Sequence, residues 1–408
     1  MSSDFDVAVV GSGFGGSLTA LCLRRLGRSV LLLESGSHPR FAIGESSSPL
    51  ANLLLETLCL RYDLPRVAPL SAWGSWQRVY PEIGCGLKRG FTFYGHRRGR
   101  PFAGREDRAD QLLVAASPCD EVADTHWYRP DFDHFLVREA AREDAEYLDR
   151  TRIERVGFDA SGATVEFVRE GRRRRFRTRL IVDASGPRGF LQRALGLEER
   201  AFADLPATEG LYTHFAHVER LEEMGIFRSS DQPPYPVDDA AVHHVFEGGW
   251  IWVLRFNNGV TSAGVAAAPG LASELALAEG EPAWRRLLAR LPTVRDQFAG
   301  SRALLPFVYR ERLPFRTSAA AGPSWTMLPS AAAFVDPILS TGFPLTLLGI
   351  ERLAAAVEES WGRPSFPARL ARDARRTLAE ADTAARLVAG LFASFGDFPL
   401  FAELTKLY

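Results

Sequence analysis

The stretch that decides the fold is VAVVGSGFGG, residues 7–16. Four small or β-branched apolar residues lead into a Gly-x-Gly-x-x-Gly motif. An apolar helical pattern follows as far as Gly27, and a second apolar run, residues 30–33, ends at Glu34. A strand, a glycine turn, a helix, a second strand and an acidic residue in this order predict a Rossmann-type βαβ unit.

Each part of this unit has a physical role in holding a dinucleotide. Gly11 permits the tight turn, Gly13 lets the backbone approach a pyrophosphate, and Gly16 lets the helix pack close to the strand. The helix N-terminus offers free N–H groups and the positive end of its dipole to the phosphates. Glu34 follows Gly16 by 18 residues and is suited to accept hydrogen bonds from ribose hydroxyls. The dinucleotide-binding residues predicted from this segment are Gly11, Gly13, Phe14, Gly15, Gly16 and Glu34.

Composition limits the remaining choices. The 408 residues include 49 Lys plus Arg and 50 Asp plus Glu, a net charge of -1 that argues against a nucleic-acid partner. The N-terminal sequence lacks the pattern of a signal peptide, and Asp336 and three prolines interrupt the apolar stretch 327–350, so we expect no membrane span. The four cysteines lie far apart without metal-ligand spacing. We therefore expect a cytoplasmic protein with reduced thiols and no metal.

A second segment bears on which dinucleotide is bound. Residues 180–186, LIVDASG, form an apolar strand that ends in a turn of small residues. The segment resembles the Asp-Gly segment of FAD-dependent aromatic hydroxylases, which places Asp183 near the pyrophosphate. Downstream of Trp127 we expect a helix with Asp131 as its N-cap, and Arg129, Phe132 and Asp133 fit the Arg-x-x-Phe-Asp pattern of those flavoproteins. Because the chain has a single Rossmann fingerprint, the resemblance implies FAD.

Residues 249–256, GWIWVLRF, resemble the Trp-x-Trp-x-Ile-Pro segment of the flavin-dependent halogenases. Trp250 and Trp252 match both tryptophans, whereas Leu254 and Arg255 replace the isoleucine and the proline. Residues i and i+2 of a strand point to the same face, so the two indoles would form one wall. In this family such a wall keeps the organic substrate away from the flavin.

A second halogenase-like segment contains a lysine. Residues 87–93, LKRGFTF, resemble the family's Lys-x-Gly-x-x-Phe segment, which makes Lys88 the active-site lysine. An amine whose pKa is lowered by partial burial can hydrogen-bond hypohalous acid or be chlorinated by it. The alternative is a surface lysine in a region that Arg89, Arg97 and Arg98 already make basic.

The third and most specific segment is FVDPILSTGF, residues 334–343. It resembles the family's Asp-Pro-x-x-Ser-Thr-Gly run before a long helix. Such a helix N-terminus can hold chloride, which assigns the halide to Thr341 and Gly342. Halogenases that act on free tryptophan carry a glutamate where this chain has Leu339, so the chain is more similar to the phenol and pyrrole branch. The flavin-binding residues implied here are Asp336, Pro337, Gly342 and Phe343.

Two more features complete the predicted site. Residues 44–46, Gly-Glu-Ser, resemble the family's strap beside the isoalloxazine ring, with Arg40, Glu45 and Ser46 as flavin-binding residues. Ser330 stands where the family carries an aspartate that binds the ribityl chain. Ser330 can still form a hydrogen bond, but it lacks the charge of that aspartate.

The predicted fold is an α/β flavoprotein of the aromatic-hydroxylase architecture. A discontinuous FAD-binding domain is expected over residues 1–60, 125–200 and 320–360. A mostly antiparallel substrate domain is expected over 61–124 and 201–319, and a helical C-terminal cap over 361–408.

The resemblance implies an FAD-dependent oxidoreductase with three activities open. The first is halogenation of an electron-rich aromatic by reduced FAD, O2 and chloride or bromide. The second is hydroxylation by a flavin monooxygenase, with a protein-bound tryptophan among its substrates, and the third is FAD-dependent reduction of a double bond. The aromatic substrate is free or carrier-bound, and the reduced flavin comes from a separate flavin reductase or from NAD(P)H.

Overall fold

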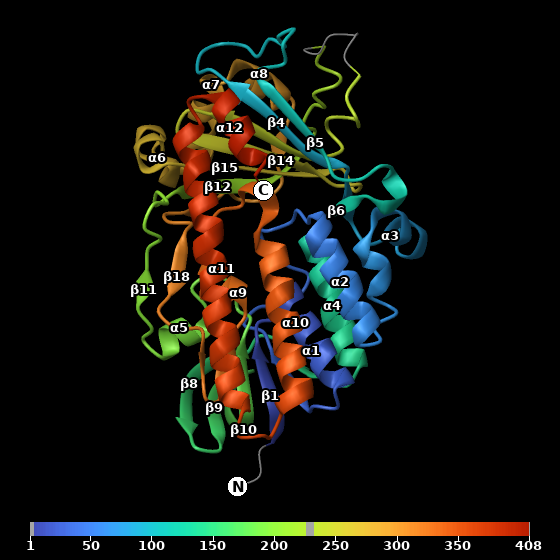
Figure 1. The fold of residues 1–408 in the computed structure, drawn as a ribbon, viewed down its shortest axis with the longest axis vertical. Helices are drawn as coiled ribbons and strands as arrows, with labels where there is room; N and C mark the ends of the chain where they lie inside the picture. Colours follow the sequence, from blue (N-terminus) through green and yellow to red (C-terminus); the bar gives the residue numbers. More distant parts are fainter. Residues whose placement is uncertain (1–3, 226–231, 408) are drawn as a thin grey trace.

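The computed structural model describes residues 4–225 and 232–407 as an elongated molecule with a β-sheet toward each end (Figure 1). The first sheet has the strand order β19-β20-β10-β1-β2-β7, and its central strands are parallel. Val7 of β1 pairs with Leu180 on one side and with Val30 on the other. The strands of this sheet are β1 (Phe5–Val10), β2 (Val30–Leu33), β7 (Glu146–Leu148), β8 (Arg152–Asp159), β9 (Gly162–Arg169), β10 (Arg172–Asp183), β19 (Ala321–Gly322) and β20 (Trp325–Met327).

The second sheet has the order β16-β12-β15-β14-β13-β4-β5, with β17 paired to β12. Its pairs are antiparallel except β13 with β4. The sheet is therefore the mostly antiparallel one that the sequence predicts. Its strands are β4 (Gly90–His96), β5 (Gln111–Ala115), β12 (Glu209–Ala216), β13 (Ala241–Phe246), β14 (Gly249–Arg255), β15 (Val260–Ala267), β16 (Arg302–Ala303) and β17 (Val308–Arg310).

Helices pack beside both sheets. In Figure 1, α1, α2, α4 and α10 lie side by side over the first sheet, and α11 runs along the molecule from the first sheet to the second. Short strand pairs join the two ends: β3 (Cys85–Lys88) with β6 (Asp124–Trp127), and β18 (Phe315–Thr317) with β11 (Glu199–Arg200) and β21 (Ala333–Phe334). The helices are α1 (Phe14–Arg25), α2 (Pro49–Arg61), α3 (Trp73–Val79), α4 (Arg129–Arg142), α5 (Phe190–Ala194), α6 (Pro269–Leu275), α7 (Glu281–Ala289), α8 (Pro292–Gln297), α9 (Pro329–Ala332), α10 (Gly342–Ser360), α11 (Phe366–Ser394) and α12 (Phe398–Thr405).

The α/β class predicted from the sequence is confirmed. All strands of the first sheet come from residues 1–60, 125–200 and 320–360, and those of the second from 61–124 and 201–319. The division into an FAD-binding domain, a substrate domain and a C-terminal cap stays a prediction.

The predicted N-cap of α4 is wrong. The helix begins at Arg129 with Tyr128 as its N-cap, because Pro130 fits the first turn, where its missing N–H costs nothing. Asp131 lies inside that turn, and its carboxylate accepts a hydrogen bond from the backbone N–H of Gly84 at 3.0 Å.

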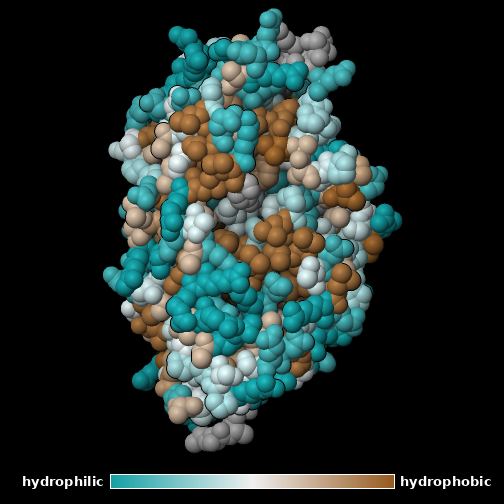
Figure 2. Space-filling view, in the orientation of Figure 1, coloured by the Kyte–Doolittle hydropathy of each residue, from teal (hydrophilic) through white to brown (hydrophobic). Residues whose placement is uncertain are grey.

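One helix of the described chain is long and apolar enough to cross a membrane. It comprises α10 and the turn before it, Ile338–Ser360, and 78% of its most apolar window is buried inside the protein. It is a core helix, in line with the expected lack of a membrane span. Figure 2 shows that apolar side chains also reach the surface over α2 and α12, where Leu53 and Leu400 are exposed.

Candidate functional site

The glycine turn after β1 leaves no room for side chains. Gly11 has a φ of +100°, and a Cβ there would lie 2.5 Å from the carbonyl oxygen of Ala184. A Cβ on Gly16 would lie 1.8 Å from the carbonyl oxygen of Gly11. Both positions therefore require glycine. The turn leads into α1 at Phe14, whose first N–H groups have no partner within the helix.

Glu34 at the end of β2 has a full set of hydrogen-bond donors. Its carboxylate accepts from the backbone N–H of Ser12 at 3.1 Å and of Gly36 at 2.9 Å, and it pairs with Arg40 at 3.3 Å. Burial alone would raise the pKa of Glu34, but these hydrogen bonds and the guanidinium lower it to about 2. Glu34 therefore stays charged.

Two guanidinium groups face the glycine turn. A Cβ on Gly13 would lie 3.4 Å from Arg129 Nη2 and 3.6 Å from Arg40 Nη2. Arg129 is held by Asp133 at 2.7 Å, whereas Arg40 Nε is buried without a hydrogen-bond partner in the part of the chain that the structure describes. Cations and an orphaned donor beside a helix N-terminus fit the pyrophosphate of FAD.

Asp183 and Ser330 are the two other residues predicted to bind the flavin at this end, and their surroundings differ from those of Glu34 and Arg40. Both carboxylate oxygens of Asp183 are used inside the following turn, where they accept hydrogen bonds from Ser185 N at 3.0 Å and from Leu191 N at 2.6 Å. Asp183 therefore braces the turn. Ser330 lies half-buried in α9 and is not among the residues lining the main cavity.

The main cavity lies where the second sheet meets the turn before α10 and the Gly-Glu-Ser strap. It encloses about 980 Å³ of empty space, part of which is open to solvent. Aromatic and apolar side chains make up most of its wall, as in many sites for organic ligands. Its lining consists of Ile43, Gly44, Glu45, Ser46, Pro187, Arg188, Tyr212, Ala241, His243, Trp250, Trp252, Leu254, Arg310, Arg312, Leu313, Phe334, Asp336, Pro337, Ser340, Gly342 and Phe343.

The two tryptophans of β14 lie on one face of the strand, as their spacing predicts. Both line the cavity, and their ring centroids are 5.6 Å apart. Trp250 donates its indole N–H to Asp336 Oδ1 at 3.2 Å, and Trp252 donates to Ser262 Oγ at 3.3 Å. The hydrogen bonds fix the two rings as one wall.

Lys88 is fully buried beside the cavity. Its Nζ donates to Ser46 Oγ at 2.9 Å and to the carbonyl oxygen of Ser47, and it lies 3.8 Å from the centroid of the Phe91 ring. Burial lowers the pKa of Lys88, and the nearby Asp124 carboxylate only partly opposes this. The surface alternative for Lys88 is therefore wrong, and the amine reaches the cavity wall through Ser46.

The turn before α10 is tightly bent. Leu339 and Ser340 adopt left-handed backbone angles, with φ of +63° and +56°. Asp336 at its start accepts from the backbone N–H of Ile338 at 3.0 Å, and burial raises the pKa of Asp336 to about 7. Ser340 and Gly342 line the cavity, whereas Thr341 is buried beside them and does not.

Glu45 on the strap has a partner that the sequence did not reveal. Nε2 of His214, on β12, lies 2.7 Å from Glu45 Oε1, and both side chains are buried. Glu45 Oε2 is buried with no hydrogen-bond partner among the described residues. The two residues are 169 positions apart, and His214 lies in a strand, β12, whose residues 210–215 are all buried, so burial does not single it out.

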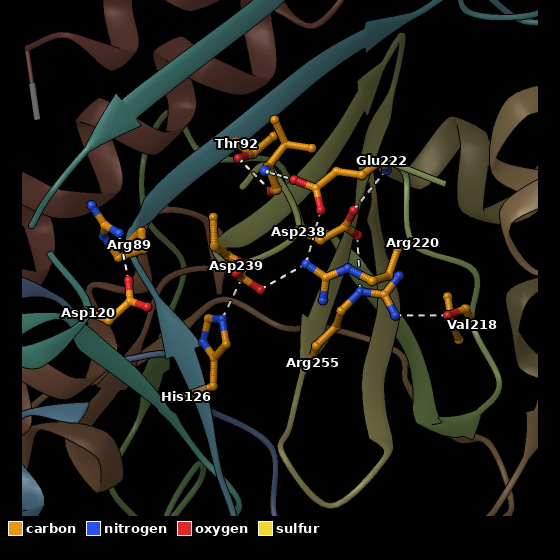
Figure 3. Close-up of polar contacts among 12 residues, drawn as sticks. Arg89, Thr92, Asp120, His126, Val218, Arg220, Glu222, Asp238, Asp239 and Arg255 are labelled. Atoms are coloured by element: carbon orange, nitrogen blue, oxygen red, sulfur yellow. Dashed lines mark hydrogen bonds and ion pairs between the residues drawn. The ribbon is translucent and has the colours of Figure 1, made fainter. Parts of the chain in front are cut away.

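The arginine that replaces the family's proline serves another part of the molecule. Figure 3 shows Arg255 in a polar cluster, where its guanidinium pairs with Asp238 at 3.0 Å and donates to the carbonyl oxygen of Val218 at 2.8 Å. Arg255 does not line the cavity. Its presence therefore leaves the tryptophan wall unchanged.

A family model described as FAD dependent oxidoreductase matches residues 6–332, which is most of the chain and includes the glycine turn. The chain belongs to this family. Its cofactor is accordingly FAD, which the residues around Gly13 fit.

Individual relatives narrow the assignment. This FAD-dependent oxidoreductase is 29% identical over 420 residues to tetracycline 7-halogenase of Kitasatospora aureofaciens, covering 99% of the chain and 72% of that protein. It is 29% identical over 414 residues to monodechloroaminopyrrolnitrin halogenase PrnC of Pseudomonas fluorescens, covering 100% of the chain and 71% of that protein. The crystal structure of halogenase PltM with phloroglucinol and FAD matches with a TM-score of 0.88 and 27% identity, covering 99% of the chain and 79% of PltM.

These findings confirm the predicted resemblance and the predicted enzyme class. The protein is an FAD-dependent enzyme of the flavin-dependent halogenase family. Of the three activities left open by the sequence, halogenation of an aromatic substrate is the one that the relatives support.

Proposed function

We propose that this enzyme halogenates the ring of a free phenol-type or pyrrole-type aromatic compound, using chloride or bromide, reduced FAD and O2. The observation that carries the proposal is the buried amine of Lys88, held by Ser46 at the edge of a cavity walled by two indoles. A buried amine of lowered pKa can hydrogen-bond hypohalous acid in its neutral or its charged form.

The chemistry that bound, reduced FAD supplies is its reaction with O2, through which halide is oxidised to hypohalous acid. Trp250 and Trp252 keep the aromatic substrate away from the flavin and thereby suppress direct hydroxylation. Lys88 holds the hypohalous acid and orients its halogen toward the substrate ring.

We assign halide binding to Thr341 and Gly342. The first N–H groups of α10 have no partner within the helix, and the helix dipole adds positive potential there. The left-handed residues before them turn the backbone toward the cavity wall, which Ser340 and Gly342 form. The flavin would lie against Pro337, Gly342 and Phe343, opposite the strap with Glu45 and Ser46.

The relatives support a free rather than a carrier-bound substrate. The chain is 29% identical to the tetracycline and PrnC halogenases and 27% identical to PltM, which was crystallised with phloroglucinol. Identity to the chlorinase of a carrier-bound pyrrole is lower, 24% over 350 residues. Leu339, in place of a glutamate, also agrees with the phenol and pyrrole branch. Supply of reduced flavin by a separate reductase and a cytoplasmic location belong to the same proposal.

The test is product mass after incubation with reduced FAD, air and bromide. We expect bromination of phloroglucinol-type phenols or of free pyrroles, and no product from the Lys88→Ala variant that still binds FAD. Equal turnover without bromide, with oxygen from O2 in the product, would identify a hydroxylase. Turnover of an alkene without air would identify a reductase, and activity only on carrier-bound pyrrole would reverse the choice of a free substrate.

A further inference from the structure

One imidazole in the cavity wall has a ring nitrogen that no step of the proposed chemistry uses. His243, on β13, is 2% exposed and lines the cavity. Its Nδ1 lies 2.8 Å from the carbonyl oxygen of Ala241, and because a carbonyl oxygen only accepts, Nδ1 carries the proton of this hydrogen bond. Nε2, at the far end of the ring, makes no hydrogen bond within residues 4–225 and 232–407.

The charge state of His243 decides what Nε2 can do. Burial, with a smaller contribution from the nearby Lys88 amine, lowers the pKa of His243 to about 3, and the carbonyl oxygens of Ala241 and Thr92 oppose this only in part. The ring is therefore neutral near pH 7. A neutral imidazole with its proton fixed on Nδ1 has one lone pair to offer, at Nε2, and the matching ligand group is an O–H or N–H donor.

His243 lies beyond the tryptophan wall in the second sheet. Neighbouring strands follow one another in the order β12, β15, β14, β13 and β4. The strap carboxylate Glu45 contacts the first of these strands, where it lies 2.7 Å from His214. The two indoles stand on β14, in the middle of the row. Along the sheet, the wall thus separates His243 from the carboxylate that is assigned to the flavin.

The surroundings of His243 are aromatic and include the neighbour of the buried amine. The centroid of its ring lies 4.5 Å from that of Phe93, 5.1 Å from that of Trp250 and 5.9 Å from that of Phe91. Lys88 Nζ lies 3.8 Å from the centroid of the same Phe91 ring. A flat ligand that is hydrogen-bonded to His243 is therefore held near the amine that delivers the halogen.

We propose that His243 is a substrate-binding residue whose Nε2 accepts a hydrogen bond from the ring hydroxyl of a phenol or the ring N–H of a pyrrole. The inference rests on the proposed function and narrows its substrates to aromatic rings that carry such a donor. The hydrogen bond fixes which carbon of the ring faces Lys88. It also draws the donor proton away from the ring, which makes the ring richer in electrons for attack on the halogen.

The adjacent histidine shows what a purely structural imidazole looks like in this sheet. His244 points to the opposite face of β13. Its Nδ1 lies 2.9 Å from His96 Nε2, its Nε2 lies 2.9 Å from Gln297 Oε1, and it does not line the cavity. Both nitrogens of His244 are thus used inside the protein. His243 has one fixed and one unused nitrogen, which is the pattern expected of a residue that binds a ligand.

The test compares a phenol with its methyl ether, and a pyrrole with N-methylpyrrole, in the wild type and in His243→Phe. Reduced FAD, air and bromide are supplied, and kcat/KM for bromination is measured for each compound. Phenylalanine keeps the aromatic packing but offers no acceptor, so the preference for the donor-bearing compound should fall by about 10-fold to 100-fold. His243→Gln, whose amide oxygen can accept, should keep part of the preference.

Two controls separate substrate binding from damage to the sheet. His244→Gln changes the adjacent histidine on the other face, and it should lower the melting temperature without changing the preference. Dissociation constants of the phenol and of its methyl ether are measured by calorimetry on protein loaded with oxidised FAD, where no turnover occurs. Their ratio should fall in His243→Phe as the kinetic preference does.

Each outcome decides the proposal. If the wild type forms no brominated product, the proposed function fails, and the ratio of dissociation constants alone decides whether His243 binds the donor. If His243→Phe lowers both members of a pair equally, His243 is a structural residue and the inference is overturned. An equal loss of preference in His244→Gln would overturn it as well. Should His243→Phe not fold, His243→Leu, which also lacks an acceptor, replaces it in the same comparison.

Discussion

The nucleotide end and the cavity end of the molecule treat their carboxylates in opposite ways. Glu34 accepts hydrogen bonds from two backbone N–H groups and pairs with Arg40, and its pKa falls to about 2. Glu45 and Asp336 are equally buried, yet each keeps one oxygen without a partner among the described residues. The protein itself satisfies the carboxylate of Glu34 at the nucleotide end, but it leaves the carboxylates of Glu45 and Asp336 at the cavity end incompletely hydrogen-bonded.

The difference follows from what each end must do. A site that holds a phosphate or a ribose needs fixed charges, and satisfied hydrogen bonds keep a charge fixed. A site that moves a proton or a halogen needs groups that change their state, and incomplete hydrogen bonding leaves that freedom. The low pKa of Glu34 and the raised pKa of Asp336 are consequences of the same contrast.

The largest expected effect is at the nucleotide end. The Gly16→Ala variant places a Cβ 1.8 Å from the carbonyl oxygen of Gly11, so α1 and β1 cannot keep their contact. We expect no folded, flavin-loaded protein. The Gly157→Ala control, where no atom lies within 4 Å of the added Cβ, should leave the melting temperature and the flavin absorbance nearly unchanged.

The nucleotide end could be predicted from the sequence because its contacts are local. The glycine turn, α1, β2 and Glu34 lie within residues 5–34, and each follows from spacing and glycine geometry. Asp131 was wrongly predicted as an N-cap because Pro130 allowed the helix to begin earlier.

The cavity end could be predicted only where a resemblance supplied it. Lys88, Trp250, Trp252 and the turn before α10 were found that way. In the structure the two tryptophans and the turn line one cavity, and Lys88 contacts its wall through Ser46. His214 could not be found, because its role depends on packing β12 against a strap 169 residues earlier. Alternation along a strand shows which residues are buried, but not which carboxylate they meet.

The second prediction concerns the buried amine. Replacing Lys88 by Met should reduce halogenation by about 1000-fold at unchanged flavin binding, because the amine that holds hypohalous acid is gone. The variant should also be more stable than the wild type, by about 2 kcal/mol in urea unfolding, since an apolar side chain replaces a buried ammonium.

The stability gain of Lys88→Met should depend on pH. The pKa of Lys88 is lower in the folded state than in the unfolded chain. Between these two pKa values the unfolded chain binds a proton that the folded protein does not, so the wild type loses stability as pH falls through this range. The gain of Lys88→Met should therefore be larger at pH 6 than at pH 9. A variant less stable than the wild type at both pH values would show that Lys88 is a structural residue.

The third prediction uses the pKa of Asp336. In the folded state this pKa is raised from 3.8 to about 7, so the folded protein holds a proton that the unfolded chain releases between these values. The stability contributed by that proton is present below pH 3.8 and is lost as pH rises to 7. Asp336→Asn removes this dependence.

The comparison with Asp336→Asn is therefore made at two pH values. Between pH 5 and pH 8 the wild type should lose on the order of 2 kcal/mol more than the variant in urea unfolding. Apo-protein is used for both, so that flavin binding contributes to neither curve. Parallel curves would mean that Asp336 is ionised throughout, and the contrast with Glu34 would disappear.

The smallest expected effect compares the two indoles of the wall. Trp250 donates to a carboxylate of the cavity, whereas Trp252 donates to the hydroxyl of Ser262 inside the sheet at 3.3 Å. Ser262→Ala leaves the Trp252 N–H buried without an acceptor, which should lower the free energy of unfolding by about 1 kcal/mol. Because the ring stays packed against Tyr212 and Trp250, the ratio of halogenated to hydroxylated product should not change. A rise in hydroxylated product would show that the position of the Trp252 indole depends on the Ser262 hydrogen bond as much as on packing. The Trp252 indole would then share the incomplete fixation that distinguishes the cavity end from the nucleotide end.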